Sequence, residues 1–220
     1  MTEYLFRLES YQKNCLEEPR VNRKEYSAGM VKLSFWFSEF RKVILLLNSG
    51  KTMEEIKKLN TEQNIFSAPT AARAITVFNT VSNRVKSLDG SFYKLFEESD
   101  IAAQKIIALI ALMNVDSLFF DFVYEVYREK LIIGVNRLAD SDIRIFFRDK
   151  QLQSEKVAKW TDYTLARLGA CYKTLLMEAG ITDHASGDRE LLKPVLDKRL
   201  EDCLKANGMG VYINALTGVK

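Results

Sequence analysis

The apolar residues of this chain recur three and four positions apart, which is the spacing of one face of an α-helix. No stretch shows the strict alternation of apolar and polar residues that marks a half-buried strand. The periodic segments predict helices near residues 30–48, 52–63, 69–88, 100–113, 116–133, 141–152, 154–160, 161–179 and 195–206. We therefore expect an all-α fold.

The predicted helices have recognisable first and last residues. Thr52 and Glu55 fit a capping box, in which each side chain accepts a hydrogen bond from the backbone N–H of the other residue. Three aspartates precede apolar runs and fit the N-cap role: Asp100, Asp116 and Asp140. Five glycines follow helices, where a left-handed residue is favoured: Gly50, Gly90, Gly134, Gly180 and Gly208. These signals mark the helix ends independently of the apolar pattern.

The segment 119–131 is dense in aromatic residues, and its helical pattern buries a wide apolar arc. Asp121, Glu125 and Glu129 form an i, i+4, i+8 row on the same segment. Such a row is compatible with a metal or acid–base site, but no histidine converges on it, and its charge would repel phosphate. We expect a core helix with a solvated acidic face, and not a base-stacking platform.

Composition indicates a soluble globular protein. The chain has 220 residues, and its 47% hydrophobic content suffices for a packed core. The first ten residues are too polar for a signal peptide, and the longest apolar runs, 106–113 and 43–47, are shorter than the ~20 residues of a membrane span. We expect a cytoplasmic location.

Residues for catalysis are sparse. Cys15, Cys171 and Cys203 form no CxxC pair, which predicts free thiols in a reducing compartment. His184 is the single histidine, in a predicted solvated loop, so multi-histidine metal sites are excluded. The sequence also has no GxGxxG motif and no GKS/T phosphate loop. We therefore predict no catalytic residues, no metal site and no cofactor, and hence a protein that is not an enzyme.

Positive charge is concentrated in the first third of the chain. Residues 30–95 contain ten Lys or Arg against five Asp or Glu, a net charge of +5, whereas residues 96–150 have a net charge of −3. The sign changes close to residues 89–91. We predict an N-terminal extension over 1–25, a basic helix-turn-helix-like lobe over 26–90, a larger helical bundle over 91–220, and a flexible connection over 181–189.

The helices predicted in the basic lobe follow one another in the manner of a helix-turn-helix unit. One face of the helix over 69–88 is predicted to be buried and comprises Ile75, Phe78, Val81, Val85 and Leu88. The opposite face has no carboxylate and comprises Arg73, Thr76, Thr80, Asn83, Arg84 and Ser87. Cations and hydroxyls bind phosphate, and amide or guanidinium groups bind base edges, so this face suits a duplex groove. Further backbone contacts are assigned to Lys51, Lys57, Lys58 and Lys86. An ordinary solvated helix in a small bundle is the alternative.

A second group of candidate residues lies within 154–179. Thr161 and Trp160 are predicted to cap and staple the helix over 161–179, with Leu165 as the partner of Trp160. Its predicted buried stripe comprises Leu165, Leu168, Tyr172, Leu175, Leu176 and Ala179. Its outer face comprises Tyr163, Ala166, Arg167, Ala170, Thr174 and Met177. Arg167 and Lys159 are candidates for weaker nucleic-acid contacts, and the small alanines suit packing against a partner helix equally well.

Segments 119–131 and 154–168 resemble the BrxA family of bacteriophage-exclusion (BREX) defence systems, and segments 26–30 and 140–147 are similar too. The resemblance extends over about residues 26–218. It implies a small, non-enzymatic, all-helical bacterial protein in a family likened to the RNA-binding antitermination factor NusB, so that the larger bundle is expected to be NusB-like. It also implies that the protein is encoded with an adenine methyltransferase, an ATPase, a phosphatase-like protein and a protease-like protein. The resemblance transfers no catalytic residue.

The charge distribution and the resemblance together predict an accessory subunit of BREX anti-phage defence that binds double-stranded DNA, mainly through phosphate contacts. The preference for DNA and the role in defence follow from the resemblance. The other BREX proteins are the expected protein partners. Two alternatives stay open: a protein-only scaffold that joins the BREX components through the helix over 161–179, and NusB-like RNA binding.

Overall fold

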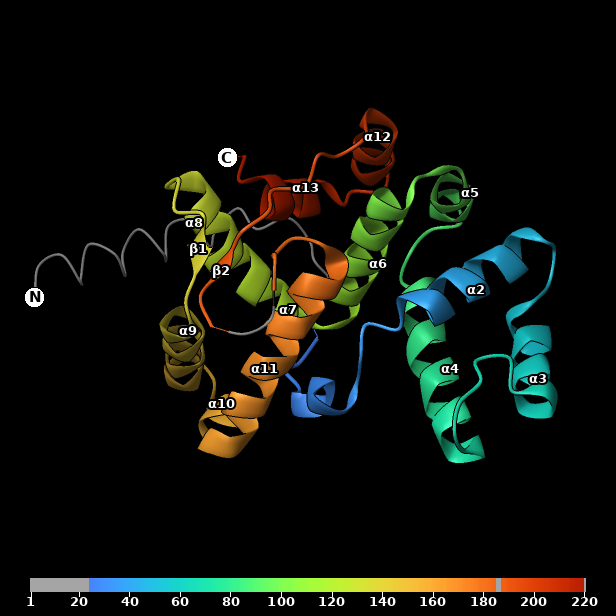
Figure 1. The fold of residues 1–220 in the computed structure, drawn as a ribbon, viewed down its shortest axis with the longest axis horizontal. Coiled ribbons are helices and arrows are strands. Elements are labelled where there is room, and N and C mark those ends of the chain that lie inside the picture. Colours follow the sequence, from blue (N-terminus) through green and yellow to red (C-terminus); the bar gives the residue numbers. More distant parts are fainter. Residues whose placement is uncertain (1–23, 185–186, 220) are drawn as a thin grey trace, which may run out of the picture.

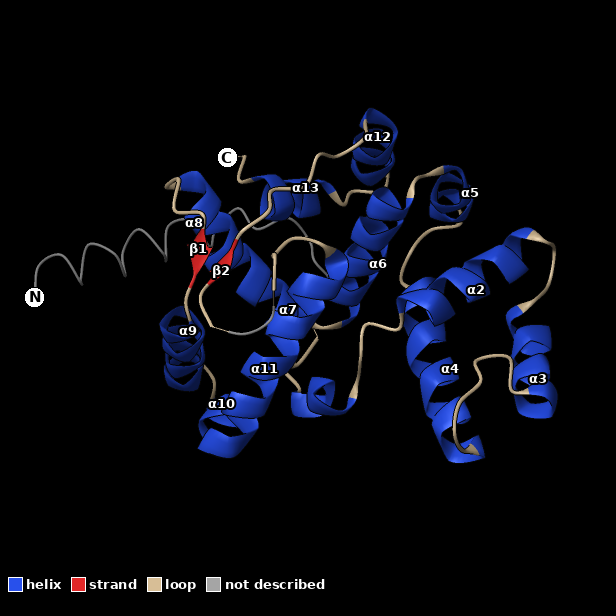
Figure 2. Cartoon of the chain, viewed as in Figure 1, coloured by secondary structure: helices blue, strands red, loops and turns tan. Residues whose placement is uncertain are grey.

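The structure is a computed structural model that describes residues 24–184 and 187–219, and it is almost entirely helical (Figures 1 and 2). The all-α prediction is confirmed. The first part of the described chain comprises η2 (Ala28–Lys32), α2 (Phe37–Asn48), α3 (Met53–Gln63), α4 (Ala71–Lys86), α5 (Ser91–Glu98) and α6 (Ile101–Val115). The second part comprises α7 (Ser117–Phe122), the π-helical segment η3 (Val123–Tyr127), α8 (Arg128–Ile132), β1 (Arg137–Leu138), α9 (Asp140–Gln153), α10 (Glu155–Ala158), α11 (Asp162–Ala179), β2 (Arg189–Glu190), α12 (Lys198–Ala206) and α13 (Gly210–Thr217).

Most of the predicted helix ends are confirmed. The Thr52 hydroxyl accepts from the Glu55 N–H at 3.2 Å, and the Glu55 carboxylate accepts from the Thr52 N–H at 2.7 Å. Asp100 and Asp116 are N-caps as predicted, but Asp140 is the first residue of α9. Gly50, Gly134, Gly180 and Gly208 have positive φ. The prediction for Gly90 is wrong, because its φ of −57° is right-handed and it immediately precedes α5.

The sequence pattern did not predict α5, α13 or the two strands. α5 packs against α2 and α6, and α13 packs against η3, α8 and α12, so both helices are supported by tertiary contacts. Of the predicted flexible connection over 181–189, the structure describes residues 181–184 and 187–189, which include the short strand β2. β2 pairs antiparallel with β1, and the fully buried Arg189 donates to a carboxylate oxygen of Asp140 at 2.7 Å.

The predicted helix over 30–48 is interrupted between residues 33 and 36. The backbone there is not helical, and Trp36, the N-cap of α2, is left-handed with φ 50° and ψ 47°. The carbonyl oxygens of Ser34 and Phe35 accept hydrogen bonds from the Arg84 guanidinium at 2.9 and 2.6 Å. The Arg84 side chain of α4 therefore binds the two carbonyl oxygens that would accept backbone hydrogen bonds in a continuous helix.

α2, α3 and α4 form one end of the long axis of the molecule, and α6 joins them to the remaining helices (Figure 1). A single hydrophobic cluster extends from Met30 to Leu216, so the core is continuous across residues 89–91. η2 packs against α11. The connection from α2 to α3 has the four-residue length of a helix-turn-helix turn, but the connection from α3 to α4 spans residues 64–70.

Among the described residues, no single helix is long and apolar enough to cross a membrane. The consecutive runs Ile101–Val115 and Ser117–Ile132 satisfy the length and composition only as a pair, with a bend of 116° between them. Both runs belong largely to the hydrophobic core.

Candidate nucleic-acid interface

The exposed face of α4 is rotated from the predicted one. Phe78, Val81, Val85 and Leu88 are buried as predicted, whereas Ile75 is 51% exposed. Ala74, Val77, Ser82 and Arg84 are buried in addition. The exposed row, which we call the α4 row, comprises Ala72, Ile75, Thr76, Asn79, Asn83 and Lys86. At 100° per residue these side chains lie within an arc of about 100°, so they form one narrow stripe along the helix.

Arg84 is not available to phosphate, and its assignment to the exposed face is wrong. Its side chain is 2% exposed and donates to the two carbonyls of residues 34 and 35. Burial lowers the pKa of Arg84 to about 10, although the negative charges of Asp116 and Glu178 favour its charged form. The helical pattern alone missed this because an arginine beside a buried stripe is normally solvated.

Arg73 is half-buried, and its guanidinium lies 4.9 Å from the centroid of the Trp36 ring. This is a cation–π contact, which holds the side chain against the start of α2. Arg84 approaches the same ring at 5.9 Å. Two arginines of α4 therefore contact the Trp36 ring, and only Arg73 retains partial contact with solvent.

The lysines assigned to this surface are exposed: Lys51, Lys57, Lys58 and Lys86. Lys58 lies 3.8 Å from Glu62 one turn later on α3. Within the described ranges, the other three lysines form no ion pair. α3 also exposes Glu54 and Glu55, so its charge is mixed, whereas α4 contains no acidic residue. Cations around a helix without carboxylates are compatible with a polyanionic partner.

The hydroxyls predicted to bind nucleic acid are already used locally as donors. Thr76 and Thr80 donate to the carbonyls of Ala72 and Thr76, each at 2.9 Å, and retain lone pairs that can accept. The side-chain amides of Asn79 and Asn83 are exposed and make no hydrogen bond within the described residues. The sequence pattern assigned Asn79 to neither face, because at 100° per residue it lies between Ile75, at the edge of the predicted buried stripe, and Asn83, at the edge of the polar face.

Arg167 and Lys159 are exposed but are not brought together with the α4 row. α10 and α11 lie toward the opposite end of the long axis from α4 (Figure 1). The predicted faces of α11 agree with the structure except at Leu165 and Met177, which are both half-buried. Leu168, Tyr172, Leu175 and Leu176 are buried, and Tyr163 is 72% exposed. A groove of about 600 Å³ between α9 and α11 is lined by Arg144, Arg148, Lys173 and the small residues Ala166, Gly169 and Ala170, among others.

The acidic row predicted to be a solvated face contains a buried ion pair instead. Asp121 is 3% exposed, and the equally buried Lys150 lies 3.3 Å from its carboxylate and 2.6 Å from that of Glu125. The Tyr26 hydroxyl donates to Asp121 at 2.5 Å. The two carboxylates raise the pKa of Lys150 against the opposing effect of burial. Segments 26–30 and 119–131 thus meet α9 at this network.

Burial, together with the Asp121 carboxylate, raises the pKa of Tyr26 to about 12. The neutral phenol is favoured in the folded state, so its contribution to stability is present below pH ~10 and is lost as the pH rises to about 12. We expect Tyr26→Phe to be less stable than the wild type at pH 8, and the difference to shrink between pH 10 and 12. Urea unfolding across this range measures the difference. The control Tyr163→Phe removes an exposed hydroxyl, and its difference in stability from the wild type should stay constant over this pH range. If the difference for Tyr26→Phe also stayed constant, the result would contradict the role of Tyr26 in the network.

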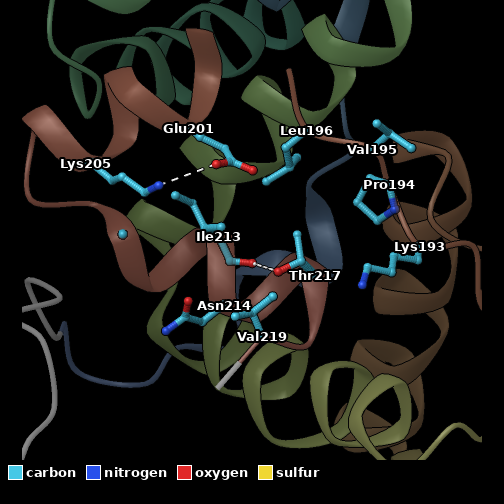
Figure 3. A pocket seen from close by; sticks show the side chains of 11 residues that line it. Lys193, Pro194, Val195, Leu196, Glu201, Lys205, Ile213, Asn214, Thr217 and Val219 are labelled. Atoms are coloured by element: carbon cyan, nitrogen blue, oxygen red, sulfur yellow. Dashed lines mark hydrogen bonds and ion pairs between the residues drawn. The ribbon is translucent and has the colours of Figure 1, made fainter. Parts of the chain in front are cut away.

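A cavity of about 710 Å³ lies between residues 193–196 and helices α12 and α13 (Figure 3). Its polar groups are largely paired with one another: Lys205 with Glu201 at 3.4 Å, and the Thr217 hydroxyl with the Ile213 carbonyl at 2.7 Å. The remaining lining is mostly apolar, and Val195 is 95% exposed at its edge.

The other reactive side chains are dispersed. His184 is exposed as predicted, and Cys171 and Cys203 are free, half-buried thiols, whereas Cys15 lies outside the described residues. No group of three or more His, Cys, Asp or Glu among the described residues is arranged to hold a metal ion.

The fold and this surface define a small all-helical protein with exposed lysines and a carboxylate-free helix at one end. Residues 24–208 match the family described as BrxA. A curated relative, "BREX protein BrxA" from Bacillus cereus (strain H3081.97), is 37% identical over 198 residues, which cover 90% of this chain and 99% of the relative. The chain therefore belongs to the BrxA family.

A solved structure shares the fold. It is the crystal structure of an uncharacterized protein from Magnetospirillum magneticum, with a TM-score of 0.74 and 17% sequence identity. The similarity covers 89% of this chain and 100% of that one.

Proposed function

We propose that this protein is a non-enzymatic accessory subunit of a BREX anti-phage defence system and that it binds duplex DNA mainly through phosphate contacts. Membership of the BrxA family and the BREX name of its relative support the role in defence. The observation that carries DNA binding is the α4 row, an exposed stripe of amide, hydroxyl, aliphatic and cationic groups on a helix without carboxylates. Duplex DNA is compatible with such a surface, because the phosphates that flank each groove would repel carboxylates on the helix.

The structure changes which residues carry the proposed contacts. Lys51, Lys57, Lys58 and Lys86 are the exposed cations for phosphate, and Arg73 contributes from beside Trp36. Thr76 and Asn83 supply hydrogen-bonding groups on the α4 row, with the half-buried Thr80 at its edge. Arg84 acts only by fixing the backbone before α2.

Gel shifts on duplex DNA at increasing salt test this function. If the protein contacts about four phosphates, log affinity should fall with log salt at a slope of about −3 to −4. The variant Lys57→Glu/Lys86→Glu should bind at least tenfold more weakly at low salt and reduce the slope by about 2, because it removes two cations.

The matched control is Lys193→Glu/Lys198→Glu, which changes the net charge equally at exposed positions outside α2–α4. It should keep most of the affinity and the full slope. Absence of duplex binding at low salt, or equal losses in both variants, would overturn the proposal. Preferential binding of duplex RNA or single strands in the same assay would favour a NusB-like activity instead.

A scaffold for other BREX proteins is the second candidate function, and the observation that favours it is the outer surface of α11. Tyr163 is 72% exposed, and Ala166 and Ala170 lie one turn apart beside the groove against α9. Small residues permit close approach of a partner helix. Pull-downs with the methyltransferase, ATPase, phosphatase-like and protease-like components, using Ala166→Arg/Ala170→Arg, test it: loss of a partner with retained DNA binding would support the scaffold.

A further inference from the structure

The middle of the α4 row has the chemistry of base recognition and not that of phosphate binding. Ile75, Asn79 and Asn83 follow one another at intervals of four residues, and each is exposed. Lys86, at the C-terminal end, is the only cation of the row. Phosphates are bound chiefly by cations, whereas neutral amides and aliphatic groups discriminate between base edges.

The amide groups are free to bind a ligand. Neither Asn79 nor Asn83 uses its side chain in a hydrogen bond within the described residues, in contrast to Asn60, whose amide donates to the Ala74 carbonyl at 3.0 Å and joins α3 to α4. Each free amide offers both a donor and an acceptor. In the major groove, adenine presents the complementary pair, an acceptor at N7 and a donor at N6.

Ile75 adds an apolar contact to this row. Ile75 is 51% exposed on a polar face, so about half of this β-branched side chain stays in contact with water in the free protein. The C5-methyl group of thymine is the apolar feature of the major groove, and aliphatic side chains contact it there. Ala72, one turn before Thr76, leaves room for the start of α4 to approach the groove closely.

The dimensions agree with this mode of binding. An α-helix is about 10–12 Å in diameter and fits the major groove, which is about 12 Å wide, whereas the minor groove is only about 6 Å wide. From Ile75 to Asn83 the helix rises about 12 Å, which corresponds to roughly three to four base pairs. One insertion of α4 therefore places all three side chains against neighbouring base pairs.

We infer that α4 enters the major groove, that Asn79 and Asn83 each bind the N6/N7 edge of an adenine, and that Ile75 contacts a thymine methyl group. The protein then prefers an element of three to four base pairs that is rich in A·T. This inference rests on the proposed function, to which it adds sequence preference, while the lysines supply most of the affinity.

The test begins with selection of bound 20-base-pair duplexes from a randomised pool by the full-length protein. Enriched duplexes should share a short A·T-containing element. In such a duplex, 7-deazaadenine at the element removes the N7 acceptor without changing base pairing, and should weaken binding by roughly 5- to 30-fold. Replacing thymine by uracil removes the methyl group and should weaken binding by a few-fold.

The variants assign these effects to side chains. Asn79→Ala/Asn83→Ala should bind the selected duplex as weakly as the wild type binds the 7-deazaadenine duplex. Introducing 7-deazaadenine should not change the affinity of this variant further. Ile75→Ala should be insensitive to uracil. The control Asn136→Ala/Asn214→Ala, at asparagines outside α4, should keep the full sensitivity to both bases. All substituted α4 side chains are exposed, so folding is retained and is checked by thermal unfolding.

The inference is overturned, with the proposed function intact, if duplex binding shows the expected salt slope but no enriched element, or if 7-deazaadenine does not change the affinity of the wild type. The inference is also overturned if the asparagine variant loses the same amount of affinity on every duplex, because that pattern indicates a contact that does not discriminate between bases. Absence of binding to any duplex at low salt overturns both proposals.

Discussion

Replacing Lys150 by methionine is expected to lower the free energy of unfolding by about 3–5 kcal/mol. Lys150 is 3% exposed and lies 3.3 Å from Asp121, which is equally buried, and 2.6 Å from Glu125. Methionine preserves most of the side-chain volume, so the loss reflects removal of the buried ammonium group that now lies against the two carboxylates. Urea unfolding at pH 7 measures the change.

The control for this prediction is Lys198→Met. Lys198 pairs with Asp202 at 2.5 Å, but its side chain is 74% exposed, and ion pairs between solvated side chains contribute little to stability. The double variant Asp121→Asn/Lys150→Met should recover part of the stability, because it removes both charges. Similar losses in Lys150→Met and Lys198→Met, or no recovery in the double variant, would show that the buried pair is not what stabilises this region.

Arg84→Met is expected to lower the free energy of unfolding by about 2–4 kcal/mol. The substitution leaves the Ser34 and Phe35 carbonyls without the guanidinium that now donates to them at 2.9 and 2.6 Å. Removing a buried charge offsets part of the loss, since burial already disfavours the charged form and lowers the pKa of Arg84 to about 10. Chemical denaturation measures the change.

Lys86→Met is the matched control, because it removes a cation from the same helix at an exposed position. Its stability should stay within about 0.5 kcal/mol of the wild type. The two variants should also differ in DNA binding: Lys86→Met weakens it directly, whereas Arg84→Met acts only through the fold. Loss of affinity in Arg84→Met with unchanged stability would contradict the structural role of that residue.

The two predicted losses of stability both involve side chains that contact the segment over residues 24–36. Near its start, Tyr26 donates to Asp121 of the buried network at 2.5 Å, and near its end the carbonyls of residues 34 and 35 accept from Arg84 of α4. Between these points, η2 packs against α11. The segment therefore connects the buried network of η3 and α9 to α4, the helix that carries the proposed DNA contacts.

The positions of the longer helices were predictable from the sequence because local signals agreed with the apolar pattern. α3 and α11 begin within two residues of the predicted starts, at Thr52 and Thr161, whose hydroxyls accept from the backbone as N-caps. The buried side of α11 also agreed, since Leu168, Tyr172 and Leu176 recur at helical spacing. In these segments propensity, capping and periodicity favour the same conformation.

The candidate site was predicted less well. The sequence identified α4 and its lack of carboxylates, and Asn83 and Lys86 are exposed as expected. It misplaced Arg84 and Ile75, because two adjacent buried stripes are compatible with the same apolar residues, and only the helices that pack on α4 select one of them. α2, α3 and α6 cover the sides that contain Val77 and Arg84, which leaves Ile75 and Asn79 outward.

The sequence by itself therefore determined the helical class, most helix ends and the basic character of residues 30–95, since these depend on local backbone preferences and on composition. Only the tertiary structure decided which charges are buried. Asp121, Lys150, Arg84 and Arg189 are stabilised by partners from distant segments. A charge is buried only when long-range packing supplies its partner, and one-dimensional periodicity contains no information about that partner.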